Sequence, residues 1–61
     1  MIVDGQKYIS EKEVSAQFGL SLGWIRKLRY SDGLPYHKLN RKVFFNEREV
    51  GQWLKDNLKP M

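Results

Sequence analysis

The apolar residues of this chain fall into three groups with helical spacing. The first two groups are the pairs Val14/Phe18 and Ile25/Leu28, and each pair would share one face of a helix. The third group has the i, i+3, i+4, i+8 spacing of a helical stripe and consists of Val50, Trp53, Leu54 and Leu58. The pattern therefore predicts three short helices.

Polar residues mark both ends of the first helix. Ser10 and Glu13 have the spacing of a capping box, in which the serine oxygen and the glutamate carboxylate bond to each other's backbone amides. Gly19 is suited to the left-handed residue that ends a helix. These signals predict a first helix over residues 11–18.

The second and third helices have their own N-cap candidates. Ser21 predicts a helix over residues 22–30, and Asn46 with Glu49 predicts a helix over residues 47–58. The first two helices are joined by only three residues, one of them glycine. Two short helices joined in this way are typical of a helix-turn-helix.

Residues 36–45 have the pattern of a β-hairpin, in which successive side chains point to opposite faces. They follow a Gly-Leu-Pro sequence that cannot continue a helix. A two-residue turn at residues 40–41 would place Leu39 and Val43 on opposite faces of the hairpin. A three-residue turn at residues 40–42 would instead pair Leu39 with Val43. We favour the three-residue turn because it collects the apolar side chains on one inner face.

The three-residue turn has consequences for the rest of the hairpin. It pairs His37 with Phe45 and directs Phe44 outward, so His37 is expected to be a partly buried packing residue and not a catalytic or pH-sensing group. It also places Arg41 and Lys42 at the tip. A wing with this tip could meet a phosphate backbone or a minor groove.

Together these elements predict a fold that is mainly α with a small β-hairpin. We expect a winged helix-turn-helix with three helices and a two-stranded wing. The chain is expected to form a single domain over residues 1–61, with its ordered core at about residues 8–58.

Composition excludes several classes of protein. The 61 residues include no cysteine and a single histidine, which excludes a disulfide framework and a thiolate zinc site. The sequence contains no Ser/His/Asp set, phosphate-cradling glycine loop or paired carboxylates, so we expect no enzyme, catalytic residue, metal or cofactor. It also contains no signal peptide or membrane span, and we expect a cytoplasmic, nucleoid-associated protein that does not contact membranes.

The distribution of charge is more informative than the net charge of +4. Residues 26–42 contain six basic residues and one acidic residue, for a net charge of +5, whereas the remainder nets −1. A basic centre within a nearly neutral scaffold is typical of nucleic-acid binding, although a solvated basic face is the more common outcome.

The face of the second helix opposite Ile25 and Leu28 strengthens this interpretation. At 100° per residue it carries Gly23, Arg26, Lys27 and Tyr30, with Trp24 and Arg29 on its flanks. A glycine there would allow close approach to a groove floor, and Arg26 could reach a guanine edge or a phosphate. The alternative is a polar face that is simply solvated.

The ordered series of these elements resembles the MerR-like excisionase and AlpA-type family of winged helix-turn-helix DNA-binding proteins. The segments that resemble its helix-turn-helix are residues 8–14 (YISEKEV), 18–21 (FGLS) and 24–28 (WIRKL). The segments that resemble its wing and closing helix are residues 33–36 (GLPY), 38–43 (KLNRKV) and 49–54 (EVGQWL). One departure is Asn40, where the family often has glycine, but asparagine tolerates a positive φ.

The resemblance implies a small accessory protein of a phage, prophage or integrative element. Such proteins bind double-stranded DNA with a sequence preference, and several copies often bend attachment-site DNA so that an integrase excises the element. Partners would be DNA, an integrase or recombinase and further copies of the chain on DNA, with no small-molecule effector. The chain lacks the long dimerisation helix of full MerR regulators, which favours an excisionase over a ligand sensor. An AlpA-like prophage transcriptional regulator is the alternative.

The expected DNA contacts come from two elements. By resemblance, the second helix would enter the major groove and the wing the adjacent minor groove. The helix residues expected to contact DNA are Ser21, Gly23, Trp24, Arg26, Lys27 and Tyr30. The wing residues expected to contact DNA are Lys38, Asn40, Arg41 and Lys42.

A hypothesis from another class is a protein-interaction module whose basic face meets an acidic partner. Its contacts would then be the aromatic residues expected at the surface, namely Tyr8, Phe44 and Trp24. The two hypotheses are compatible, because excisionase-like proteins also contact integrase.

Overall fold

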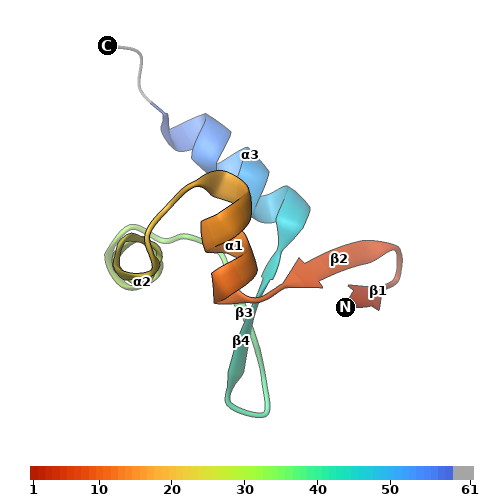
Figure 1. The fold of residues 1–61 in the computed structure, drawn as a ribbon. Coiled ribbons are helices and arrows are strands. Elements are labelled where there is room, and N and C mark those ends of the chain that lie inside the picture. Colours follow the sequence, from red (N-terminus) through yellow and green to blue (C-terminus); the bar gives the residue numbers. More distant parts are fainter. Residues whose placement is uncertain (59–61) are drawn as a thin grey trace.

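The computed structural model describes residues 1–58 and contains three helices and four strands (Figure 1). Their order along the chain is β1 (Ile2–Val3), β2 (Gln6–Ile9), α1 (Glu11–Phe18), α2 (Leu22–Ser31), β3 (His37–Leu39), β4 (Lys42–Asn46) and α3 (Glu47–Asn57). In Figure 1 the hairpin of β3 and β4 projects away from the helices, and the hairpin of β1 and β2 extends to the side opposite α2.

All three helices begin at the predicted caps. Ser10 and Glu13 form the complete capping box of α1, and Gly19 ends that helix in the left-handed conformation with φ of 69°. The Ser21 side chain accepts a hydrogen bond from the backbone of Trp24 at the start of α2. The helix-turn-helix geometry expected from the spacing of these caps is thus confirmed.

The last helix differs from the prediction at its C-terminal end. Asn46 caps α3 as expected by accepting the Glu49 amide, and Val50 is fully buried. The helix ends at Asn57, however, and Leu58 is 75% exposed. The prediction that Leu58 completes the buried stripe is wrong, because Leu58 follows the helix as its extended C-cap, whereas Leu54 is the last residue of the stripe that packs against the core. Trp53 is partly buried, not central.

The sheet contains a hairpin that the sequence analysis did not predict. Its four strands lie in the order β1-β2-β4-β3, with β1 and β2 joined by the turn Asp4-Gly5. Both turn residues have positive φ, 51° and 76°, as a type I′ turn requires. An Asp-Gly pair between short apolar segments is a recognised hairpin signal, so this element could have been read from the sequence.

The wing turn is also type I′, and the predicted three-residue turn is wrong. Leu39 pairs with Lys42 and Lys38 pairs with Val43, so only Asn40 and Arg41 form the turn. Their φ angles are 50° and 71°. A type I′ turn has the same twist as the strands that it joins. The stability gained from this match is greater than the stability that would be gained by placing both Leu39 and Val43 on the inner face.

This register changes which hairpin residues are covered. Because side chains alternate along a strand, Val43 lies on the same face as the fully buried Phe45, whereas Leu39 lies on the other face and is 54% exposed. Phe44 pairs with His37 and is half-buried.

His37 is exposed, contrary to the prediction of a partly buried packing residue. Its Nε2 lies 2.7 Å from the Glu49 carboxylate, and its ring meets the edge of Tyr8. These contacts make it a surface link between the wing, β2 and α3.

The core is a single cluster to which all three helices and the sheet contribute. Its buried members are Ile9, Val14, Ile25, Leu28, Leu34, Phe45 and Val50. Phe45 is the largest of the fully buried side chains. β4 is central to this arrangement because it pairs with both β2 and β3 and leads directly into α3.

Among residues 1–58 no helix has the length and apolar character that crossing a membrane would need.

The core and the corrected register together make a stability prediction. Phe45→Ala should lower the free energy of unfolding by about 3–5 kcal/mol, since it removes a buried ring and leaves a cavity. Leu39→Ala should change the free energy of unfolding by less than about 0.5 kcal/mol, because its side chain is exposed. Thermal unfolding followed by circular dichroism measures both. A large loss for Leu39→Ala would contradict the two-residue turn.

Candidate nucleic-acid interface

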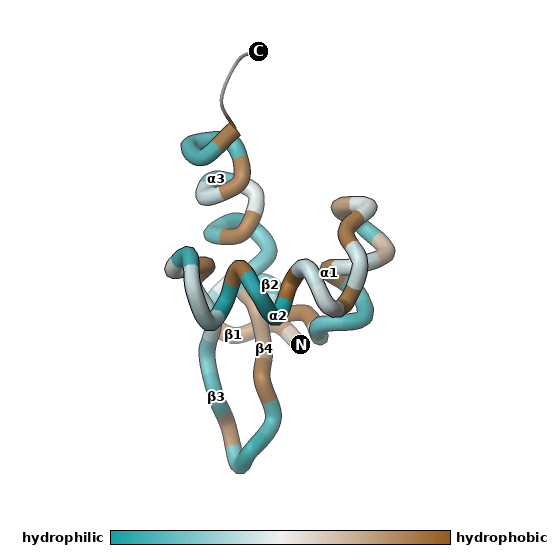
Figure 2. The backbone as a smooth tube through the Cα atoms, turned by 90° about the vertical axis from the view of Figure 1, so that its left-hand side faces the viewer, coloured by the Kyte–Doolittle hydropathy of each residue, from teal (hydrophilic) through white to brown (hydrophobic). Residues whose placement is uncertain are grey.

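Helix α2 separates its apolar and polar residues sharply. Ile25 and Leu28 are buried against the core at 0% and 9% exposure, whereas Tyr30 is 76% exposed. Gly23, Trp24, Arg26 and Lys27 are exposed as well. Figure 2 shows α2 across the molecule, with the hairpin of β3 and β4 extending beyond it to a hydrophilic tip.

Gly23 has no structural role in the folded chain. A Cβ built at this position meets nothing within 4 Å, and its φ lies outside the left-handed region. Glycine in a helix destabilises it by about 1 kcal/mol relative to alanine. The open space at Gly23 thus lies on the outer surface of α2, near the N-terminus of the helix.

Arg26 is held by the first helix of the helix-turn-helix. Its Nε donates to Oε1 of Glu11 over 3.0 Å, and the two side chains are 57% and 19% exposed. Arg26 is therefore oriented before any ligand binds. The sequence analysis assigned it to DNA contact without finding this partner, which lies fifteen residues away in the sequence.

Lys27 and Trp24 lie together on α2. The lysine Nζ lies 5.3 Å from the centroid of the indole ring, and the ring itself is 50% exposed. Such a contact keeps the cation near an aromatic face while leaving its donors available. Trp24 also lines a small hollow with Leu20 and Trp53.

Arg29 orders the end of α2, a role that the sequence analysis did not identify. Its guanidinium lies 4.5 Å from the ring centroid of Tyr30 and 5.0 Å from that of Tyr36. Its Nη2 also donates to the Tyr30 hydroxyl over 3.3 Å. Tyr30 is thereby positioned by a cation of its own helix. The signal was available, because Arg29 is followed directly by Tyr30 and, after a Pro-containing turn, by Tyr36, and an arginine can stack on both rings.

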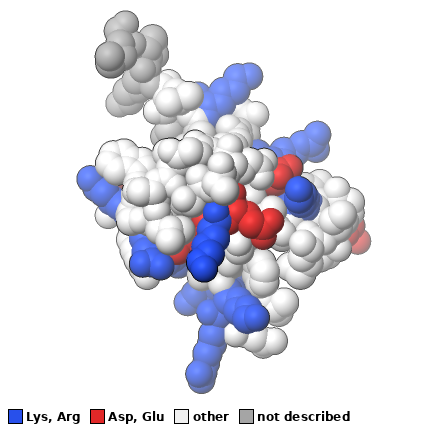
Figure 3. Space-filling view, in the orientation of Figure 1, with Lys and Arg blue, Asp and Glu red and all other residues white. Residues whose placement is uncertain are grey.

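The wing is wholly basic in its charged residues. From Gly33 to Asn46 the chain contains no Asp or Glu, and Lys38, Arg41 and Lys42 are all exposed. In Figure 3 Lys and Arg side chains extend from the lower end of the molecule, where the hairpin lies in Figure 1. Acidic side chains appear only nearer the middle and the right of that view.

Within the wing the cations point in different directions. Lys38 and Lys42 belong to successive cross-strand pairs and so lie on opposite faces of the hairpin. Arg41 occupies the turn itself with a φ of 71°, a conformation that costs an ordinary residue about 1 kcal/mol or more. The tip therefore carries a bulky cation where glycine would fit best.

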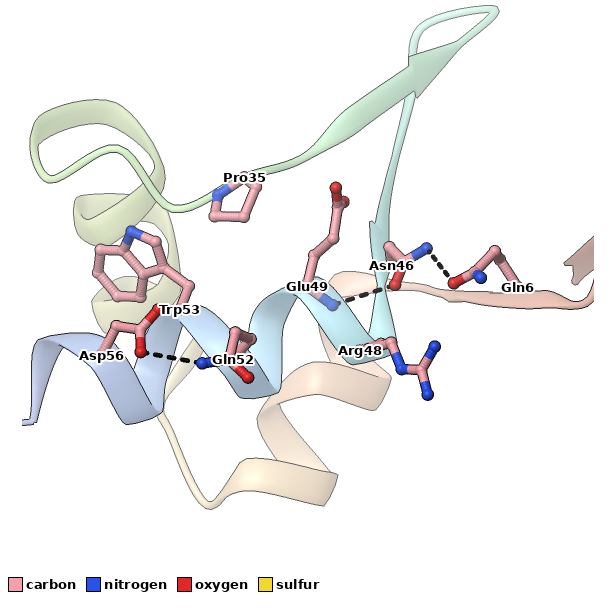
Figure 4. A pocket seen from close by; sticks show the side chains of 8 residues that line it. All are labelled: Gln6, Pro35, Asn46, Arg48, Glu49, Gln52, Trp53 and Asp56. Atoms are coloured by element: carbon pink, nitrogen blue, oxygen red, sulfur yellow. Dashed lines mark hydrogen bonds between the residues drawn. The ribbon is translucent and has the colours of Figure 1, made fainter.

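An open hollow lies elsewhere, along α3, and is shown in Figure 4. It has a volume of about 700 Å³ and is lined by Gln6, Pro35, Asn46, Arg48, Glu49, Gln52, Trp53 and Asp56. Its polar groups mostly bond to one another: Asn46 donates to Gln6, and Gln52 donates to Asp56. Within residues 1–58 no group of three or more His, Asp or Glu side chains could hold a metal ion.

The comparison with known families agrees with this geometry. A helix-turn-helix domain model matches residues 8–58, which include α1, α2, the wing and α3. The chain belongs to this helix-turn-helix family. Membership indicates DNA binding, and proteins of this family are typically not enzymes. No curated protein and no solved structure matched the chain.

The helix-turn-helix protein should become more stable when the turn strain at its wing tip is removed. Arg41→Gly is expected to raise the free energy of unfolding by about 1 kcal/mol, since glycine adopts a positive φ without steric cost. For a domain of this size the midpoint of thermal unfolding would rise by about 4–8 °C.

The matched control is Lys42→Gly, which removes the same charge from a strand position. It should lower stability, because glycine loses more conformational entropy than lysine when it is fixed in the extended conformation of a strand. A decrease for both variants would show that the Arg41 conformation is not strained.

Proposed function

We propose that the chain is a sequence-preferring double-stranded DNA-binding protein that inserts α2 into the major groove and contacts the adjacent backbone or minor groove with its wing. The observation that carries the proposal concerns Gly23 and Arg41. Each is a residue that the fold itself does not favour at its position, and each lies on an exposed basic element. A role in binding accounts for both residues.

The roles of the α2 residues follow from their contacts. The Ser21 oxygen accepts the Trp24 amide, so its hydroxyl hydrogen is available to a phosphate. The open surface at Gly23 admits the groove floor, and Arg26 reads a base edge. Lys27 and Tyr30 donate to phosphates or bases beside it.

The wing residues contribute contacts to the DNA backbone. Arg41 at the tip and the cations on either face, Lys38 and Lys42, neutralise phosphates on both sides of a groove. Asn40 sustains the positive φ of the turn and presents its amide next to Arg41. Contacts of this kind position the protein on DNA and add affinity that depends little on sequence.

Within this function we propose a role as an excisionase that binds and bends attachment-site DNA to assist an integrase. The resemblance of the helix-turn-helix and wing segments supports this role, and the alternative is an AlpA-like regulator of a promoter. Footprinting on the ends of the host element distinguishes them. Regularly spaced protection at an attachment site supports excision, whereas a single protected site over a promoter supports regulation.

Salt and substitution together test the DNA-binding mode. If about six phosphates are neutralised, the logarithm of affinity should fall with the logarithm of salt concentration at a slope near −5. Arg26→Ala should weaken binding to a duplex selected by the protein from a random pool more than binding to a scrambled duplex. Arg41→Ala should weaken both about equally. Fluorescence anisotropy measures all four affinities.

Lys55→Ala is the control, since Lys55 is exposed on the last turn of α3 and belongs to neither α2 nor the wing. It should leave both affinities nearly unchanged. An equal loss for both duplexes with Arg26→Ala would contradict base reading by Arg26.

Gly23→Ala should separate stability from binding. The added methyl meets no protein atom, so the free energy of unfolding should rise by about 1 kcal/mol while affinity for the selected duplex falls. Gly51→Ala is a matched control in α3, where the new Cβ would make an ordinary contact with Phe18 at 3.9 Å. It should stabilise the protein and leave affinity unchanged. Full affinity in Gly23→Ala would show that this surface does not approach DNA.

A further inference from the structure

The ion pair between Glu11 and Arg26 differs from the other ion pairs among residues 1–58. Lys7–Glu47 links β2 to α3, and His37–Glu49 links the wing to α3. Only Glu11 engages a cation on the exposed face of α2, with Oε1 3.0 Å from Nε of Arg26.

Glu11 is well placed to act as a fixed anchor. It is the first residue of α1, where the helix dipole favours a negative charge, and its side chain is only 19% exposed. Arg26 is 57% exposed, so the arginine is the partner that a ligand can reach. The carboxylate thus holds the guanidinium, and α1 holds the carboxylate.

The atom that Glu11 engages determines what Arg26 can still do. A guanidinium is planar, so a hydrogen bond at Nε restricts the direction of the whole group. No hydrogen bond occupies Nη1 or Nη2 within the described chain. These are the two nitrogens that an end-on contact to guanine O6 and N7 uses, and ordering them in advance reduces the entropy lost on binding.

The carboxylate also acts on DNA directly. Glu11 adds a negative charge beside a face that is proposed to approach phosphates, and this charge opposes binding to any sequence. A correctly placed base offsets the opposition through Arg26, whereas an incorrect base does not. Selectivity of this kind comes from a penalty on the wrong ligand as well as from contact with the right one.

We propose that Glu11 is a specificity-determining residue that orients Arg26 for base reading and weakens binding to non-cognate DNA. The proposal rests on the DNA-binding role proposed for α2. It assigns to the first helix of the helix-turn-helix a part in sequence choice, although Glu11 itself need not touch a base.

The experiment compares Glu11→Gln with Glu13→Gln. Both variants remove one negative charge from the first turn of α1, but Glu13 accepts the Ser10 amide in the capping box, and glutamine can retain that bond. Each variant and the wild type are used to select duplexes from a random pool. Their affinities for the wild-type-selected duplex and for a scrambled duplex are then measured at one salt concentration.

We expect Glu11→Gln to bind the scrambled duplex more tightly than the wild type does. The ratio of its affinity for the wild-type-selected duplex to its affinity for the scrambled duplex should fall about tenfold, which is part of the discrimination that a bidentate arginine contact supplies. Its selected sequences should relax at the same base position as those of Arg26→Ala, and the double variant should relax no further. Glu13→Gln should strengthen both affinities by one common factor and keep the selected sequence. A purely structural ion pair would not change the base preference at one position.

Two results would overturn the proposal. One is an affinity ratio in Glu11→Gln that changes no more than in Glu13→Gln, and the other is relaxation at a position that Arg26→Ala leaves intact. The wild type alone tests the proposed function, because a wild-type chain that selects no sequence contradicts DNA reading before any variant is compared. Thermal unfolding of Glu11→Gln confirms that the compared proteins are folded.

Discussion

The burial of Phe45 is the interaction on which the rest of this small domain depends. Its ring is fully buried in a cluster that contains residues from all three helices, and no second core exists among residues 1–58 to take its place. β4, which carries Phe45, pairs with β2 and β3 and continues into α3 without a connecting loop. One strand thus fixes the positions of the wing, the N-terminal hairpin and the last helix together.

This shared core explains why the outer surface is free to serve binding. Ile25 and Leu28 pack α2 against the core, and Gly23, Arg26 and Lys27 are left exposed. Glycine at position 23 and arginine at position 41 both reduce the stability that a better-suited residue would give. A domain of this size can carry such costs because the buried residues of each element converge on the same cluster.

The cations of α2 and those of the wing differ in how firmly other side chains hold them. Three cations of α2 are not free: Arg26 is held by Glu11, Lys27 lies over Trp24, and Arg29 lies over two tyrosine rings. Held side chains lose less conformational entropy when a ligand arrives. Lys38, Arg41 and Lys42 of the wing, in contrast, form no ion pair within the described chain and suit contacts that depend on charge more than on direction.

The sequence by itself determined the helices, because their signals are local. Caps at Ser10, Ser21 and Asn46 and the periodic apolar residues act within a few positions of one another, and each helix begins where they predict. The exposed face of α2 follows from the same periodicity, and the basic character of residues 26–42 follows from the count of their charges. The Asp-Gly turn of the first hairpin was equally local and was overlooked.

The tertiary structure alone decided the wing register, the exposure of Leu58 and the partner of Arg26. A register depends on whether strand twist or apolar matching contributes more, and the type I′ geometry at Asn40 and Arg41 settles it. Leu58 is exposed because α3 ends at Asn57 and the stripe that packs against the core ends at Leu54. Glu11 meets Arg26 only because α1 and α2 cross at a particular angle, and no spacing in the sequence encodes that contact.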